Sequence, residues 1–353
     1  MDGVQRACLG QSRAGRYRAF RDRRAVRTAG LFLCLLAALL VLTLWAMTVG
    51  SSDISLPRAL QALIAPGDER ADIVIRSVRL PRVIAALSAG AALAVAGAIM
   101  QAVTGNPLAE PGLLGVNAGA SFAVILAISL AGVTAGGALV WAAFAGAALA
   151  AVAVYLLGSA GRGGATPLKL VLAGVVISTF LGSVGMAVLV LDAQTLDVVR
   201  MWSAGSLKNR EMAQILPVLP WLATALIAAI AVRDQFTALS LGADTARGLG
   251  QNPLLWRLIS GLLVVGLAGG AVAIAGPLGF VGLVVPHIVR LLVGPDYRLI
   301  LPFAVLGGAG LALLADSLPR AVLATDMPLG ITMALIGAPF FIWLANTRSE
   351  ANA

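Results

Sequence analysis

The chain has 353 residues, of which 59% are hydrophobic and only 12% are charged, and its mean hydropathy is +0.95. A soluble domain carries about 25% charged residues, so this composition excludes an ordinary soluble protein. Apolar runs close to 20 residues long indicate an all-α polytopic membrane protein. The runs are continuous rather than alternating, which argues against a transmembrane β-barrel.

A basic arm occupies residues 1–28 and supplies most of the formal charge of +9, since it holds eight arginines and two aspartates. We predict that this arm is cytoplasmic, orients the first helix and touches anionic membrane lipid. Nucleic-acid binding is disfavoured, because the arm directly adjoins a hydrophobic segment. That segment, residues 31–49, is longer than the core of a signal peptide and no A-x-A cleavage site follows it, so an uncleaved helix is expected.

Ten apolar segments are long enough to be spans, within a predicted permease domain at residues 29–347 that is followed by a cytoplasmic tail at 348–353. An even number of spans puts both termini on one side, and the basic arm places that side in the cytoplasm. Of the 25 lysines and arginines, 16 then lie inside; without the arm the count is eight inside against nine outside. The predicted spans are residues 30–49, 82–103, 113–131, 136–158, 168–190, 213–232, 257–275, 278–293, 299–316 and 328–346.

A weak internal repeat relates Ala89–Gly97 to Ala268–Gly276, with six of nine positions identical. In the predicted topology the first copy runs inward and the second runs outward, which is the arrangement of an inverted repeat in transporters. Helices rich in alanine and glycine also match one another by chance.

Three arginines on the predicted outer face, Arg79, Arg82 and Arg320, are candidate docking residues. Pro81 suits the first turn of a helix, and a spacing of three puts Arg79 and Arg82 on one face. The pair, with Arg320, is expected to form a socket for carboxylates, which arginine binds in a bidentate manner. The alternative is that the first two side chains extend to lipid headgroups.

The turn at residues 106–111 separates two spans, because its prolines block helix continuation. Glu110 within it is interpreted as a solvated loop acid. Gln101, Asn117 and Ser121 lie in or beside the flanking helices and are candidates for a translocation path, because polar groups inside a membrane usually face the bundle interior or water. Hydrogen bonding between helices is an equally good explanation.

The longest predicted inner loop contains residues 239–250. Asp244 and Thr245 are expected to begin a short helix that Gly248 or Gly250 ends. Such a helix can insert into a groove of a soluble partner, although a solvated connector would show the same pattern. The candidate contact residues are Leu241, Gly242, Asp244, Ala246, Leu249 and Gly250.

Several absences bear on function. The two lysines, Lys169 and Lys208, do not belong to a G-x-x-x-x-G-K-[ST] phosphate loop. His287 is the only histidine and is expected to be structural, and Cys8 and Cys34 form no metal-binding pattern. We therefore expect no catalytic residue, metal or cofactor on this chain. The predicted spans lack central charges of the kind that ion-coupled carriers use, which favours a pore subunit energised by a separate ATPase.

Taken together, these segments resemble the permease subunits of ABC importers for iron–siderophores, haem and vitamin B12, the FecCD-type family. Within that family, Gly115–Phe122, Trp202–Leu207 and Leu241–Ala246 look most like ferric-enterobactin (catecholate siderophore) permeases. The long basic arm is a departure from typical members. The matching segments span nearly the whole chain in family order: Arg79–Arg82, Asn106–Gly115, Leu239–Gly250, Gly279–Arg290, Pro328–Ile331 and Gly337–Trp343.

The resemblance implies a ten-helix subunit of the bacterial inner membrane that pairs with a second permease, either a copy or a paralogue. Two ABC ATPase subunits would bind ATP and Mg²⁺ inside, and a periplasmic or lipid-anchored solute-binding protein would deliver a ferric siderophore outside. Arg79, Arg82 and Arg320 would receive acidic residues of the binding protein, and the loop at 244–250 would contact the ATPase. The alternatives are a haem or vitamin B12 permease and an ion-coupled secondary carrier; a membrane-embedded enzyme has no supporting constellation.

Overall fold

The computed structural model describes residues 26–50, 54–65, 67–133, 136–161, 166–323 and 325–351. The chain divides into two compact units, residues 1–41 and residues 42–353. The first unit contributes the greater part of an apolar helix, Val26–Thr48. The second unit contains every other helix and both candidate sites. The basic arm lies almost wholly outside the described residues, so its predicted role stays a prediction.

The second unit is helical throughout its described residues, with no strand among them. Short helices alternate with the spans, and Ile75–Arg79 is a π-helical turn that joins α3 to α4. In chain order the elements are α2 (Leu56–Ile64), α3 (Arg70–Val74), η1 (Ile75–Arg79), α4 (Leu80–Thr104), η2 (Pro111–Leu114), α5 (Val116–Ala131), α6 (Gly137–Ser159), α7 (Pro167–Leu191), α8 (Ala193–Ser203), α9 (Met212–Ile215), α10 (Leu219–Ala231), α11 (Arg233–Ser240), α12 (Ala243–Gly248), α13 (Pro253–Ala275), α14 (Val281–Val293), α15 (Tyr297–Val322) and α16 (Leu329–Ala351).

The predicted all-α polytopic class is confirmed. Six described helices are long and apolar enough to cross a membrane, and α10 and α11, which meet at a bend of 59°, together have the length and composition of a further span. Three shorter apolar helices, Val116–Ala131, Val281–Val293 and Leu329–Leu344, complete the set. Each of the ten predicted segments therefore contains a helix, although α5 and α14 begin several residues later than hydropathy placed them.

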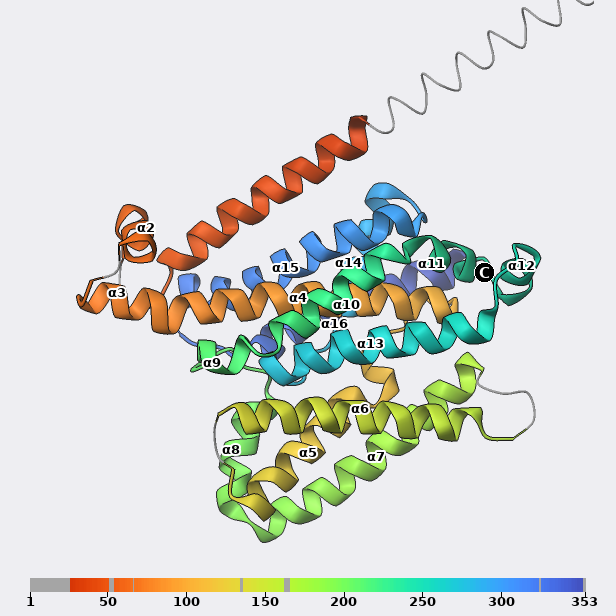
Figure 1. Ribbon diagram of the computed structural model, residues 1–353, viewed down its shortest axis with the longest axis horizontal. Helices are drawn as coiled ribbons and strands as arrows, with labels where there is room; N and C mark the ends of the chain where they lie inside the picture. Colours follow the sequence, from red (N-terminus) through yellow and green to blue (C-terminus); the bar gives the residue numbers. More distant parts are fainter. Residues whose placement is uncertain are drawn as a thin grey trace, which may run out of the picture. The chain divides into compact units, whose positions relative to one another are not determined.

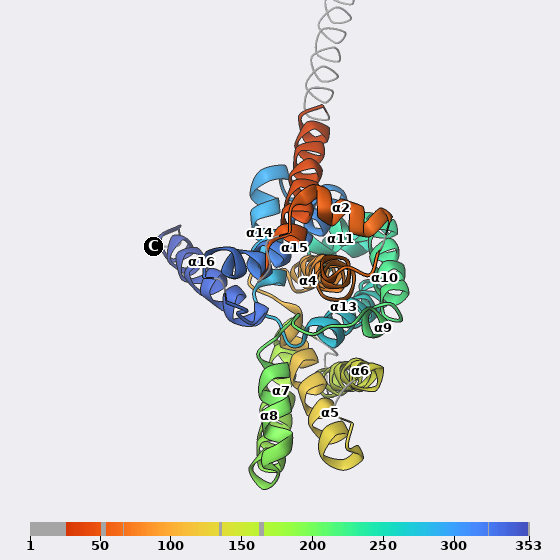
Figure 2. The same cartoon turned by 90° about the vertical axis from the view of Figure 1, so that its left-hand side faces the viewer.

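Helix α4 is the buried centre of the second unit. Figure 2 shows it surrounded by α10, α13, α14 and α15. Glycines permit the closest crossings: a Cβ on Gly90 would lie 2.2 Å from the carbonyl oxygen of Gly308, and one on Gly97 would lie 1.9 Å from that of Gly282. Such small-residue contacts drive helix association in lipid, where apolar side chains gain little by leaving it.

Helices α5, α6 and α7 lie side by side in a second group (Figures 1 and 2). Gly119 of α5 and Gly146 of α6 repeat the glycine crossing, since a Cβ on either would come within 2.3 Å of the other's carbonyl oxygen. The segments of the weak internal repeat lie on α4 and α13, which run in opposite directions in Figure 1. That orientation is the one that the inverted repeat requires.

Candidate functional site

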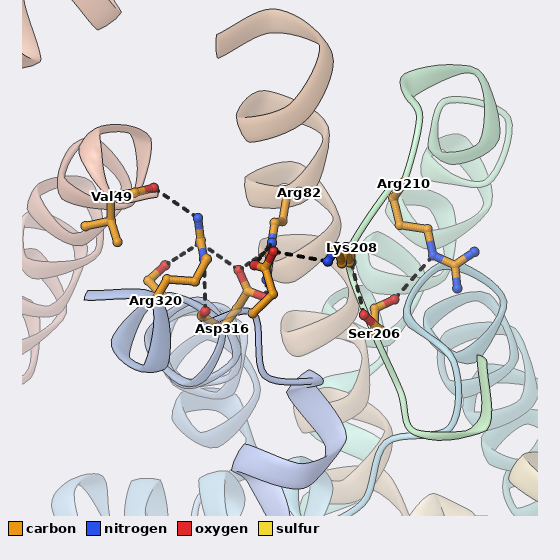
Figure 3. A network of polar contacts seen from close by, with 9 residues as sticks. Val49, Arg82, Ser206, Lys208, Arg210, Asp316 and Arg320 are labelled. Carbon is orange, nitrogen blue, oxygen red and sulfur yellow. Dashed lines mark hydrogen bonds and ion pairs between the residues drawn. The ribbon is translucent and has the colours of Figure 1, made fainter. Parts of the chain in front are cut away.

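A cluster of charged side chains gathers where α4 begins and α15 ends (Figure 3). At its centre is Asp316, whose side chain is fully buried. Arg82 donates from Nε to both carboxylate oxygens, at 3.1 and 2.9 Å. Arg320 donates from Nη2 to Oδ2 at 2.8 Å. Because Asp316 and Arg320 lie one helical turn apart on α15, they are also an (i, i+4) pair.

A second carboxylate, Asp326, contacts Arg82 from the loop before α16. Arg82 donates from Nη1 to Oδ1 of Asp326 at 2.8 Å, and Nζ of Lys208 lies 3.5 Å from the other oxygen. Burial raises the pKa of Asp326, but the hydrogen bond and charge of Arg82, with the charge of Lys208, outweigh burial and hold this pKa below its usual value. Asp326 is therefore ionised at neutral pH.

The arginines also bind the end of the first apolar helix. Nη1 of Arg79 donates to the carbonyl oxygen of Met47 at 2.7 Å, and Nη1 of Arg320 donates to that of Val49 at 3.1 Å. A helix C-terminus leaves carbonyl groups without helical partners and carries partial negative charge. Two buried guanidinium groups satisfy that end, so this part of the cluster has a structural role.

The loop between α8 and α9 adds further positive charge. Lys208 is exposed, and Arg210 is half-buried and donates from Nε to the carbonyl oxygen of Ser206 at 3.4 Å. Burial lowers the pKa of Arg210 to about 10. Since that value stays well above 7, Arg210 is still a cation at neutral pH.

The structure brings the three predicted outer arginines together, but in an arrangement that the sequence did not indicate. Arg79 and Arg82 are buried, and Arg82 and Arg320 already hold carboxylates from their own chain. Docking at these arginines stays a prediction. Asp316 and Asp326 were not among the predicted site residues; the spacing of Asp316 and Arg320 was the one local signal for the first, and Asp326 had none.

At the other end of α4, the loop that was predicted to contact an ATPase folds as a short helix, α12. The helix begins at Ala243 with Gly242 before it, so Asp244 and Thr245 lie in its first turn, as expected of residues that begin a helix. Glycine suits the turn because Gly242 has φ +98°. The helix ends at Gly248, as the glycine pattern predicted.

One side of α12 is anchored and the other faces outward. Ala246 is buried, whereas Leu241 and Leu249 are exposed. Asp244 and Arg247 form an exposed ion pair at 2.7 Å. Gly250 turns the chain away with φ +81°. Two outward leucines beside an ion pair give this side an amphipathic surface, and contact with an ATPase stays a prediction.

Two of the predicted path residues bind other segments. Gln101 is buried, accepts from Nη2 of Arg290 at 3.0 Å and donates to the carbonyl oxygen of Gly282 at 3.4 Å. Asn117 donates to the carbonyl oxygen of Leu278, in the loop before α14, at 3.5 Å. The bonds of Gln101 to α14 match the alternative of hydrogen bonding between helices. A path lined by Gln101, Asn117 and Ser121 stays a prediction.

The interpretation of Glu110 as a solvated acid was wrong. Its side chain is half-buried and accepts from the backbone N–H of Phe280, at the start of α14, at 3.2 Å. Phe280 has φ +69°, a strained conformation for a bulky residue. His287 packs edge-on against Phe340, with ring centroids 5.7 Å apart.

A cavity of about 490 Å³ lies beside Phe280, where α14 and α16 begin. The three predicted path residues are not among its described lining. The lining residues are Ser203, Ala204, Pro277, Gly279, Phe280, Gly330, Ile331, Ala334 and Leu335.

Comparisons with known proteins give a consistent result across almost the whole chain. A family model described as the FecCD transport family matches residues 38–347. The probable siderophore transport system permease protein YfiZ of Bacillus subtilis is 39% identical over 319 residues, which cover 90% of this chain and 96% of that protein. The ferric enterobactin transport system permease protein FepD of Escherichia coli is 38% identical over 334 residues, covering 94% and 98%.

A permease named for a different substrate and a solved structure also match this chain. The cobalamin import system permease protein BtuC of Halobacterium salinarum is 37% identical over 282 residues, which cover 79% of this chain and 75% of that protein. A solved structure of a metal-chelate type ABC transporter in an inward-facing conformation has a TM-score of 0.79 at 27% identity, and the match covers 90% of this chain and 99% of that chain.

Proposed function

The chain belongs to the FecCD transport family, and from that premise we propose that it is the membrane-spanning permease subunit of an ABC importer for a ferric siderophore. The observation that carries the proposal is the end-to-end match to permease proteins at 38–39% identity. An integral membrane subunit of a transport system, and not an enzyme, accounts for the helical fold. Hydrolysis of ATP and the Mg²⁺ that it needs are assigned to partner ATPase subunits.

The substrate class is inferred from the relatives. Proteins named for siderophore, ferric enterobactin and ferric hydroxamate transport are 38–41% identical to this chain. A hemin permease of Yersinia pestis at 38% and the cobalamin permease at 37% support haem and vitamin B12 as the alternatives. The catecholate-like segments of the sequence favour a ferric catecholate among these chelates.

The two candidate surfaces support the assignment of partners. We assign α12 with Leu241 and Leu249 to the ATPase contact, because an anchored helix with outward leucines can transmit movement to the span α13. We assign the outer cluster to the solute-binding protein, because cations gather there around Arg82. A second permease, a copy or a paralogue, completes the importer in the bacterial inner membrane, with both termini cytoplasmic.

The mechanism that follows is alternating access, with no covalent chemistry on this chain. The loaded binding protein docks outside and releases the chelate into a path at the interface of the two permeases. ATP-driven closure of the ATPase subunits moves α12, and through α13 it switches the path from outward to inward opening.

The experiment is uptake of radiolabelled iron by cells in which this chain is deleted and then restored. Iron is offered as catecholate, hydroxamate or haem complexes, and labelled cobalamin is a fourth substrate. Selective loss of catecholate uptake, restored by the gene, supports the proposal. Selective loss of haem or cobalamin uptake would identify that compound as the substrate instead. Unchanged uptake of all four compounds in a strain without paralogous permeases would overturn the importer assignment.

A further inference from the structure

Arg82 holds two carboxylates that differ in accessibility. The side chain of Asp316 is 0% exposed, and that of Asp326 is 36% exposed. Removing one partner from a buried ion pair is strongly destabilising, whereas exposed pairs contribute little and exchange readily. Asp316 is therefore the permanent partner of Arg82, and Asp326 is the one that another carboxylate can replace.

The cluster keeps a positive balance that attracts such a carboxylate. Among the side chains paired with Asp316 or Asp326, Arg82, Arg320 and Lys208 are three cations against two carboxylates, which leaves one net positive charge. Lys208 is itself 49% exposed. An approaching acidic side chain thus meets Lys208 first, at the place where Asp326 bridges Lys208 and Arg82.

The loop that carries Asp326 is attached to the start of α16. Three residues after Asp326, α16 begins at Leu329, and the N–H of Gly330 donates to the carbonyl oxygen of Gly205 at 2.9 Å. The contact is tight, since a Cβ on Gly330 would lie 2.4 Å from the carbonyl oxygen of Ala204. The first turn of α16 is therefore packed against, and hydrogen-bonded to, the loop that includes Lys208.

The same first turns of α16 line the cavity of about 490 Å³, together with Ala204 and Phe280. A change in the position of Asp326 is thus linked, through a few residues of backbone, to the wall of this cavity. Asp316, by contrast, lies within the continuous helix α15.

We propose that Asp326 is an exchangeable latch: an acidic side chain of the solute-binding protein takes its place on Arg82 and Lys208, and the released loop lets α16 move at the cavity. This inference rests on the proposed function, which supplies the partner, and adds the residue that is displaced. The depressed pKa of Asp326 agrees with it, because the latch is then charged at neutral pH and competes as a carboxylate.

The test replaces Asp326 with asparagine, which keeps the shape and removes the charge. Charge reversal at Arg79 or Arg82 would be a poor test, because both side chains are buried and the fold would suffer. The permease–ATPase complex is placed in lipid nanodiscs, and its Kd for the solute-binding protein is measured together with its ATPase rate. We expect Asp326→Asn to lower the Kd by about five- to tenfold, to raise the basal ATPase rate and to shrink its stimulation by the binding protein.

The matched control is Asp197→Asn, which removes one exposed carboxylate from α8, outside the cluster. It should leave the Kd and the basal rate within about twofold of the unmodified complex. The latch is overturned if Asp326→Asn leaves the Kd unchanged, weakens binding, or shifts it no more than Asp197→Asn does. Absence of any binding by the unmodified complex would instead overturn the proposed function, and the latch with it.

Discussion

The two ends of α4 present charge in opposite ways (Figure 1). At the end near α2 and α3, the guanidinium groups of Arg79 and Arg82 are buried, and those of Arg82 and Arg320 meet carboxylates of the same chain. At the end near α12, the Asp244–Arg247 pair is exposed beside two outward leucines. The first arrangement is held by partners from the same chain, whereas the second is exposed. A charged motif at the end of a predicted span therefore does not reveal by itself whether its charges are paired within the chain or exposed.

The largest expected effect is that of Asp316→Asn at the buried end. Asparagine cannot neutralise two buried guanidinium groups, so we expect a loss of about 3–5 kcal/mol in stability and little folded protein in the membrane. Yield after purification and the thermal unfolding midpoint in nanodiscs measure this. The matched control is Asp234→Asn, which breaks an exposed pair with Arg298 at 2.8 Å and should cost below about 1 kcal/mol. Equal losses would contradict the contrast between buried and exposed charge.

An intermediate effect is expected for Leu249→Glu at the exposed end. The side chain already faces outward, so the fold and the unfolding midpoint should be retained, while a charge in the partner's apolar groove should lower iron uptake by about tenfold or more. Co-purification of the ATPase subunits and uptake are both measured. Ile64→Glu, at another exposed apolar position, on α2, is the control. If uptake fell as much in the control, the effect would not be specific to α12.

The smallest effect is expected for Arg247→Gln. Its pair with Asp244 is exposed and lies within one helical turn, so it contributes about 0.3–0.5 kcal/mol. Uptake should stay within about twofold of the unmodified protein. A loss as large as that of Leu249→Glu would mean that the partner recognises the ion pair rather than the leucines.

The sequence predicted the elements well and their contacts poorly. Long apolar runs located all ten helical segments, because burial in lipid imposes length and composition locally. The pairing of Arg82 with Asp326, 244 positions apart, left no local pattern. Glu110 was misread for the same reason, since its partner Phe280 lies 170 positions away. Only packing of α4 against α14 and α15 brings those groups together.

For the short helix α12, the sequence predicted the ends but not the buried side. Asp244 and Thr245, with Gly248 or Gly250, correctly indicated a short helix, because these residue types favour the conformations at which helices begin and end. The helix begins one residue before Asp244, at Ala243. Burial of Ala246 could not be foreseen without the neighbouring α11.

The measurement that tests the account most directly is transport by the purified system in proteoliposomes. The permease is reconstituted with its ATPase subunits, the solute-binding protein and a labelled ferric catecholate. We predict accumulation that requires ATP and the binding protein together and that vanadate abolishes. Accumulation driven by an imposed proton or sodium gradient without ATP, and insensitive to vanadate, would contradict the account and identify an ion-coupled carrier.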